Sequence, residues 1–289
     1  MKKKNTLVLL PLLVNLYACA TEKETEAIKV TEATKETEIE TSNEDTAQSE
    51  TDEQSVSDDS TDNREQPSLS SSFVAKQKVL PSKTIFNYYL YTPENAKENL
   101  PLILYLHGGS GKPTAPEGDL TLLTAGDGLP KFTKDGQVKP SSYIVFPQLP
   151  YGKSGWADVK EDLKDFLTSV ADDVNADDSK ISITGHSMGG KGTWDISISY
   201  PDLFYKVAPL SGKVDTNEKT LTALKDKPVW AFVGTEDKIV PPQSSIDYID
   251  ALSKTNAKAK ITIIEGYTHF DVPNVYLSDE YDLLKWLVD

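Results

Sequence analysis

Short runs of apolar residues recur from residue 73 onward and predict a series of β-strands. Two β-rich runs, residues 73–80 and 84–91, flank Pro81-Ser82-Lys83, and this spacing predicts a hairpin. Six further runs are short and continuously apolar, as expected for strands that are buried on both faces of a sheet. These runs lie at residues 102–106, 143–146, 181–184, 207–210, 229–233 and 261–264.

Helical patterns fall between most of these runs. Residues 156–174 carry apolar side chains at spacings of three and four, which predicts an amphipathic helix. We expect further helices at residues 188–200, 244–253 and 280–288, the first of them ended by Pro201. Alternating strands and helices predict an α/β fold with a mostly parallel sheet and helices on both faces. Active sites in such sheets lie beyond the carboxyl ends of the strands.

Charge divides the 289-residue chain into three parts. Residues 1–19 carry +3, residues 20–72 carry −12 from 16 acids and 4 bases, and residues 73–289 carry −6, which together give −15. We expect no nucleic-acid partner, because a phosphate binder needs a basic face. One cysteine and three histidines exclude an internal disulfide and a cysteine zinc site and predict no metal centre. Residues 73–289 are long enough for one domain with a substantial core.

The first nineteen residues have the pattern of a secretory signal. Three lysines precede an apolar stretch of about a dozen residues, too short to span a bilayer as a helix. Leu16-Tyr17-Ala18-Cys19 resembles the lipobox of bacterial lipoproteins, although Tyr17 replaces the small or aliphatic residue usual there. The resemblance implies cleavage before Cys19, lipidation of that cysteine and a lipid-anchored, extracytoplasmic protein. An ordinary signal peptide with an incidental cysteine is the alternative.

Residues 20–72 have the composition of a disordered segment. They contain no Phe, Trp or Tyr, and 18 of the 53 residues are Ser or Thr. Such a segment buries too little apolar surface to offset the entropy of ordering it. We expect an acidic tether that holds residues 73–289 away from the membrane, the alternative being that it binds a cationic partner.

One motif predicts a catalytic nucleophile. Residues 185–190 read Gly-His-Ser-Met-Gly-Gly, directly after a predicted strand and directly before a predicted helix. This is the G-x-S-x-G nucleophile elbow in its required setting, a sharp turn that lifts the hydroxyl of Ser187 above the sheet. Gly185 and Gly189 lack the side chains that would collide there. A plain structural turn is the alternative interpretation.

A serine hydroxyl needs a neighbouring base to take its proton, and the chain has three histidines. His186 adjoins Ser187, and we expect it to point away into packing. His107 follows the first buried strand, where we expect it to brace a loop. His269 lies between the last predicted strand and the last predicted helix, so it is the histidine placed to reach Ser187.

A third residue must orient the imidazole and stabilise its positive form. Asp237 follows the strand at residues 229–233, and the order Ser187, Asp237, His269 is the chain order of α/β-hydrolases. Glu236 is the near competitor for this role. Asp271 is too close in sequence to His269 to orient it.

Acyl transfer also needs donors for the developing oxyanion. The backbone N–H of Met188 follows the nucleophile and is one candidate. Gly109, in the glycine-rich loop after the strand at residues 102–106, is the other.

Side chains after neighbouring strands are the candidates for a substrate pocket. Gln148 and Trp156 follow the strand at residues 143–146, and Trp156 either stacks on a substrate ring or caps the core. Trp194 is expected in the core. The glycine- and proline-rich stretch of residues 110–142 is expected to form one wall, with Leu122, Leu123 and Phe132 as its side chains.

Residues 73–289 resemble the α/β-hydrolase superfamily. More narrowly they resemble secreted serine esterases related to feruloyl esterases, polyhydroxybutyrate depolymerases and the phospholipase/carboxylesterase group. The residues that carry the likeness are Leu106-His107-Gly108-Gly109, residues 185–190, Gly192-Thr193-Trp194, residues 234–237 and Thr268-His269. The resemblance implies neither metal nor organic cofactor. Only residues 212–227 separate the sixth and seventh predicted strands, so we expect no cap domain.

These features together predict a serine carboxylesterase that hydrolyses short-chain or aromatic acyl esters at the cell surface. Its partner is a small or polymer-linked ester, and the sequence leaves the oligomeric state open. A serine peptidase or an acyltransferase would use the same three residues and is the alternative. A surface binding protein with a vestigial site is the third hypothesis. It is disfavoured because a protein that only binds has no need for all of Ser187, Asp237 and His269.

Overall fold

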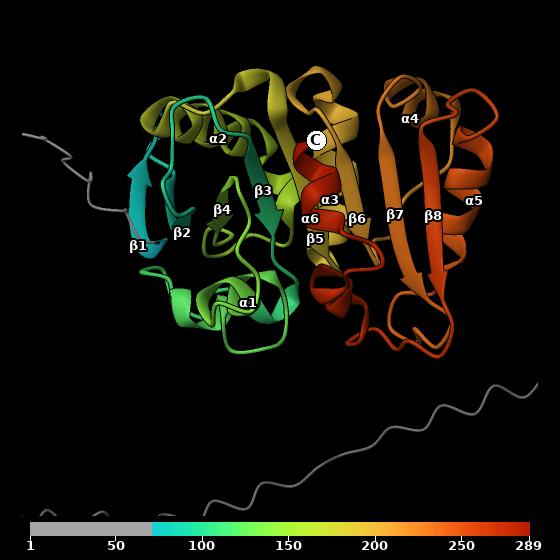
Figure 1. Ribbon diagram of the computed structural model, residues 1–289, viewed down its shortest axis with the longest axis horizontal. Coiled ribbons are helices and arrows are strands. Elements are labelled where there is room, and N and C mark those ends of the chain that lie inside the picture. Colours follow the sequence, from blue (N-terminus) through green and yellow to red (C-terminus); the bar gives the residue numbers. More distant parts are fainter. Residues whose placement is uncertain (1–70) are drawn as a thin grey trace, which may run out of the picture. The chain divides into compact units, whose positions relative to one another are not determined.

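The computed structural model describes residues 71–289. The predicted signal peptide, Cys19 and the tether up to residue 70 lie outside the described residues. Among the described residues, eight strands form one sheet in the order β1-β2-β4-β3-β5-β6-β7-β8 (Figure 1). The strands are β1 Ser72–Val79, β2 Ile85–Thr92, β3 Leu102–Leu106, β4 Tyr143–Pro147, β5 Ile181–His186, β6 Val207–Leu210, β7 Val229–Gly234 and β8 Ala259–Ile264.

The sheet is parallel except at one edge. β1 and β2 form the predicted hairpin, with Ser72 opposite Thr92, and β2 also runs antiparallel to β4. From β4 through β3 to β8 every neighbouring pair is parallel. All residues of β3, β4, β6 and β7 are buried, which explains their continuously apolar sequences. The fold class predicted from strand and helix alternation is therefore confirmed.

Helices cover both faces of the sheet (Figure 1). α2 (Lys160–Val174), α3 (Met188–Ser199) and α5 (Gln243–Leu252) pack with α4 (Glu218–Ala223) on one face. α1 (Leu129–Lys134) and α6 (Leu283–Val288) lie on the other face, with α6 against β3 and β5. Each face has its own apolar cluster, so the buried strands separate two layers of core. No helix among the residues that the structure describes is long and apolar enough to cross a membrane.

Two helices begin at a later residue than the sequence pattern predicted. The segment predicted as a helix from residue 156 starts with a 3₁₀ turn, Trp156–Val159, before α2. The last helix, predicted from residue 280, begins at Leu283 because Asp282 has a φ of 45°, in the left-handed region. The other 3₁₀ turns are η1 Gly109–Gly111, η2 Leu120–Leu123, η4 Asp178–Lys180, η5 Pro201–Leu203 and η6 Val272–Leu277.

Four connections that carry the predicted catalytic and oxyanion residues leave the sheet at its carboxyl edge. They follow β3, β5, β7 and β8, which are parallel strands, so their first residues meet at one rim. The link between β6 and β7 contains only the short α4, so no cap domain lies there. This topology brings residues 187, 237 and 269 to the same place.

Candidate active site

Ser187 sits on a strained turn between β5 and α3. Its φ of 60° and ψ of −118° are unusual for a residue with a side chain, and such strain is concentrated at functional sites. The turn presses against the end of β3. A Cβ on Gly189 would lie 1.8 Å from the carbonyl oxygen of Leu106, and one on Gly185 would lie 2.5 Å from the same oxygen. The two motif glycines are therefore required by backbone packing.

Gly189→Ala is expected to lower the free energy of unfolding by about 3 kcal/mol, because backbone atoms cannot move aside cheaply. Gly155→Ala is the matched control, since a Cβ there would have no neighbour within 4 Å. Urea unfolding of both variants measures the effect. Equal stability of the two would mean that the elbow is not packed as described.

His269 links the serine to a carboxylate. It lies in the loop between β8 and η6, and its Nε2 is 2.8 Å from Oγ of Ser187. Its Nδ1 is 2.7 Å from Oδ2 of Asp237. Both His269 and Asp237 are buried. Three residues separated in the sequence thus form a continuous hydrogen-bonded chain, with the hydroxyl at its open end.

Backbone donors fix the carboxylate of Asp237. Its Oδ1 accepts from the N–H groups of Ile239 at 3.0 Å and Val240 at 2.8 Å, which leaves Oδ2 for His269. Burial alone would raise the pKa of this carboxyl, but the hydrogen bonds from His269 and Val240 outweigh it and hold the pKa below its ordinary value. Asp237 is therefore an anion beside the imidazole.

The two rival carboxylates have other partners. Glu236 points to the surface, where its Oε2 lies 3.7 Å from Nζ of Lys238. Asp271 accepts hydrogen bonds from the backbone N–H and the hydroxyl of Thr268, so it holds the loop that carries His269. Neither contacts the imidazole by a hydrogen bond among the described residues.

His186 lies where the sequence did not place it. We expected it to point away into packing, but its ring lies 4.5 Å from the ring of His269, centroid to centroid, and it lines the cavity at Ser187. Burial and the neighbouring His269 lower the pKa of His186 to about 3, so it is neutral at physiological pH. Its Nε2 is buried and has no hydrogen-bond partner among the described residues. The direction of this side chain, next to the strained turn at Ser187, is not revealed by the sequence pattern.

His107 braces the glycine loop, as predicted. Its Nδ1 lies 2.6 Å from the carbonyl oxygen of Gly108, and its Nε2 accepts from the N–H of Leu149 at 3.0 Å. A ring nitrogen that accepts from a backbone N–H carries no proton. Burial, the largest cause, lowers the pKa of His107 to about 4, and nearby Lys112 lowers it further, against the raising effect of the Gly108 carbonyl.

The depressed pKa of His107 makes stability depend on pH. The unfolded chain takes up this proton near its ordinary value of 6.5, and the folded chain only near 4. The contribution of neutral His107 to the free energy of unfolding is therefore fully present above about pH 6.5, and it is lost as the pH falls toward 4. Between pH 7 and pH 5 we expect His107 to account for ~2 kcal/mol of the loss.

His107→Gln keeps an acceptor without a titrating group, so its loss of unfolding free energy between pH 7 and pH 5 should be smaller by that amount. His186 shifts in the same direction and leaves part of the slope in place. Urea unfolding at the two pH values measures the difference. An unchanged slope in His107→Gln would show that His107 titrates normally in the folded protein.

Two backbone N–H groups flank the hydroxyl. Met188 and Gly109 are the first residues of α3 and η1, where the N–H has no partner within its own helix. Gly109 lines the cavity beside Ser187, and a Cβ on Gly108 would lie 3.4 Å from the Cβ of Ser187. The glycine loop therefore runs close against the serine, as an oxyanion site requires.

A cavity of about 520 Å³ opens over Ser187 and His269. Phe270, 71% exposed, and Ile239, 57% exposed, form its apolar side together with Pro273. Ser110, Gly126 and Asp127 line it with the glycine loop. The sequence pattern did not predict this apolar side of the cavity. Its signal was position, because Phe270 directly follows His269 and Ile239 lies two residues after Asp237.

Two side chains proposed to contact substrate do not do so. Trp156 is 1% exposed, donates from Nε1 to the carbonyl oxygen of His107 at 3.1 Å and packs against Gly192, so it belongs to the core. Gln148 is 2% exposed and ties together the loop of residues 111–119, donating to the carbonyl oxygens of Gly111 and Asp119. For Trp156 the core alternative holds, and the prediction that Gln148 contacts substrate was wrong, because long-range contacts use its amide.

The predicted wall residues divide in a similar way. Phe132 is buried in the cluster beneath α1, so the prediction that it lines a pocket was wrong. Leu122 and Leu123 line a small recess that adjoins the cavity at Ser187. Trp194 is fully buried, as predicted.

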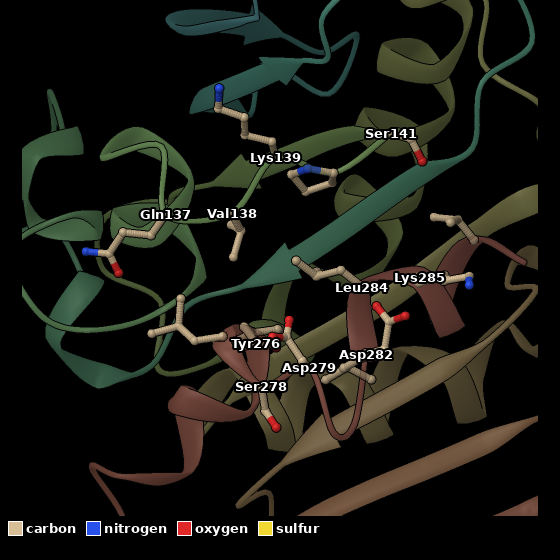
Figure 2. A pocket seen from close by; sticks show the side chains of 14 residues that line it. Gln137, Val138, Lys139, Ser141, Tyr276, Ser278, Asp279, Asp282, Leu284 and Lys285 are labelled. Atoms are coloured by element: carbon tan, nitrogen blue, oxygen red, sulfur yellow. The ribbon is translucent and has the colours of Figure 1, made fainter.

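A separate hollow of about 390 Å³ lies between residues 137–141 and the segment from η6 to α6 (Figure 2). Figure 2 shows Ser278, Asp279 and Asp282 on one side and Lys139 pointing away from them. Its lining contains none of the three histidines, so it offers no nucleophile–base pair. Among the described residues, no group of three or more His, Cys, Asp or Glu side chains could hold a metal ion.

The sheet order and the site define the class of the fold: the chain has an α/β-hydrolase fold, and Ser187, His269 and Asp237 are linked in the way that the triad of a serine hydrolase is linked. More particularly, residues 149–274 match the model of the dienelactone hydrolase family. This segment includes all three side chains of the hydrogen-bonded chain.

Comparison with solved structures gives the same fold. A thermostable esterase is 23% identical with a TM-score of 0.61, over 74% of this chain and 62% of that one. A serine-to-alanine mutant of the feruloyl esterase module from Clostridium thermocellum, complexed with sinapinate, is 15% identical over 72% and 86%, with a TM-score of 0.57. A ferulic acid esterase from Anaeromyces mucronatus, in complex with ferulic acid, is 15% identical over 78% and 93%, with a TM-score of 0.52.

A curated relative matches over a short segment. The non-reducing polyketide synthase Preu3 from Preussia isomera is 41% identical over 68 residues, which are 22% of this chain and 2% of that protein. The chain thus spans a small part of this relative and 62% of the thermostable esterase.

Proposed function

We propose that the protein is a serine carboxylesterase that hydrolyses short-chain or aromatic acyl esters through an acyl-enzyme. The observation that carries the proposal is the pair of contacts made by His269, 2.8 Å from Oγ of Ser187 and 2.7 Å from Oδ2 of Asp237. This arrangement makes the hydroxyl a nucleophile, because the imidazole can take its proton and the carboxylate stabilises the resulting cation.

The reaction runs in two halves. Oγ of Ser187 attacks the ester carbonyl while Nε2 of His269 takes the hydroxyl proton. The N–H groups of Gly109 and Met188 stabilise the tetrahedral oxyanion. His269 then gives its proton to the leaving alcohol, and the acyl group stays on Ser187. Water, activated by the same imidazole, releases the acid and restores the hydroxyl.

The open cavity favours ester substrates that stay partly exposed over lipids whose long chains must be buried. Its apolar side at Ile239 and Phe270 is exposed, and no cap covers it among the described residues. Two solved structures of similar fold are esterases bound to sinapinate or ferulic acid, which supports testing aromatic acyl groups.

A substrate panel tests the reaction class. Acetyl, butyryl and feruloyl esters and the matching amides should be offered to the wild-type protein, with and without an added alcohol acceptor. The proposal predicts that free acid forms from at least one ester and that no amide is cleaved. Faster cleavage of amides would make the protein a peptidase, and acyl transfer to the alcohol in preference to water would make it an acyltransferase.

We further propose that the enzyme acts outside the cytoplasm, anchored through a lipid on Cys19. The lipobox-like sequence and the acidic segment after it support this location. Mass spectrometry of the mature protein is expected to find an acylated Cys19 at the amino terminus. An unmodified amino terminus at another residue would contradict the anchor.

A further inference from the structure

We propose that the recess beside the glycine loop is the acyl subsite and that it selects a short acyl group carrying a hydroxyl. This inference rests on the proposed esterase function and narrows it, from short-chain or aromatic acyl esters to the short-chain ones. The recess has a volume of about 50 Å³ and adjoins the cavity over Ser187, since Gly108, Ser110 and His186 line both.

The chemistry at Ser187 decides which part of an ester faces the recess. The leaving alcohol must lie next to Nε2 of His269, because that atom gives it a proton. His269, Phe270 and Ile239 line the outer cavity but not the recess, so the alcohol faces them. The glycine loop, which offers the N–H of Gly109 to the carbonyl oxygen, continues into the recess. The acyl group therefore points inward.

The recess is too small for an aromatic acyl group. Leu122, Leu123 and Pro130 form its apolar lining. A cavity that binds benzene has a volume of about 150 Å³ in a well-studied case, three times that of this recess. We therefore assign it to an aliphatic acyl chain of a few carbons.

Two unpartnered polar groups give the recess its specificity. Tyr105, at the end of β3, is 5% exposed and lines the recess, and its hydroxyl has no partner among the hydrogen bonds of the described residues. Burial raises the pKa of Tyr105, so the hydroxyl keeps its proton and can donate it. Of these two polar groups, Nε2 of His186 is the buried atom without a hydrogen-bond partner among the described residues. An unpaired polar atom in a protein interior, such as Nε2 of His186, is costly and points to a ligand that pairs with it.

A hydroxyl on the acyl chain supplies the hydrogen-bonding partner that these groups lack. Its oxygen accepts from the phenol of Tyr105, and it exchanges a second hydrogen bond with Nε2 of His186 in either ring tautomer. A plain alkyl chain of the same length would leave Nε2 of His186 unpaired. The site should therefore prefer a hydroxyacyl ester over its alkyl counterpart.

Three p-nitrophenyl esters with the same alcohol test this preference: propionate, 2-hydroxypropionate and 3-hydroxypropionate. In the wild type, kcat/KM for one hydroxylated ester should exceed that for propionate by about tenfold, as expected for one hydrogen bond. Tyr105→Phe should lower this ratio clearly, and the part that remains comes from Nε2 of His186. Tyr248→Phe is the matched control, because that buried hydroxyl bonds to the carbonyl oxygen of Thr220, outside the recess, and should keep the wild-type ratio.

A second variant tests the recess without Tyr105. Leu122→Phe fills the space, so turnover of the hydroxypropionates relative to p-nitrophenyl acetate should fall about tenfold. An equal ratio in wild type and Tyr105→Phe, or an unchanged ratio in Leu122→Phe, would overturn the subsite. If the wild type hydrolysed none of the esters, the proposed esterase function itself would fail, which is a distinct outcome.

Discussion

Ser187→Ala is expected to lower kcat for ester hydrolysis by about 10⁴- to 10⁶-fold while the protein stays folded. The serine supplies the atom that carries the acyl group, so its loss removes the covalent route. The contacts of His269 with Asp237 do not depend on the serine hydroxyl, and removing an atom at an open cavity costs little stability. Initial rates with p-nitrophenyl acetate measure the change, with thermal unfolding as a check on folding.

Ser253→Ala provides the comparison, because this exposed serine follows α5, outside the cavity. It should keep the wild-type rate. Residual activity of Ser187→Ala within tenfold of the wild type would mean that another group attacks the ester.

Asp237→Asn is expected to lower kcat by about 10⁴-fold at neutral pH. Asparagine fits the same space and can still accept from the N–H groups of Ile239 and Val240. It no longer carries the negative charge that stabilises the imidazolium, and its amide favours the wrong tautomer of His269. The loss should therefore appear in kcat more than in KM, which steady-state kinetics at pH 7 to 8 can separate.

Glu236→Gln is the matched variant. The two residues are adjacent, and the substitution removes the same charge from a side chain that contacts Lys238 at the surface. We expect less than a twofold change in kcat. A large loss in Glu236→Gln together with a mild one in Asp237→Asn would reverse the assignment of the carboxylate.

The elements that position the site could be predicted because their signals are local. The buried strands are continuous apolar runs, and the elbow is a short motif whose glycines at 185 and 189 are required by contact with the end of β3. Parallel strands then bring the residues after β5, β7 and β8 to one edge. The meeting of Ser187, Asp237 and His269 follows from this topology.

The errors concern side chains whose surroundings come from distant segments. Trp156 and Gln148 follow a strand at the correct edge, yet the carbonyl oxygens of His107 and Gly111 bind their polar atoms. His186 precedes the strained turn at Ser187, and its ring faces that of His269, a placement that the sequence pattern does not reveal. The short helices α1 and α4 have too few residues for a periodic pattern.

Mapping of a covalent probe tests the central claim most directly. The full-length protein should be treated with a fluorophosphonate and digested, and the modified residue should be identified by mass spectrometry. We predict a single adduct on Ser187, absent from Ser187→Ala and formed much more slowly in Asp237→Asn. An adduct on a different residue, or none on the folded wild-type protein, would contradict the assignment of Ser187 as the activated nucleophile.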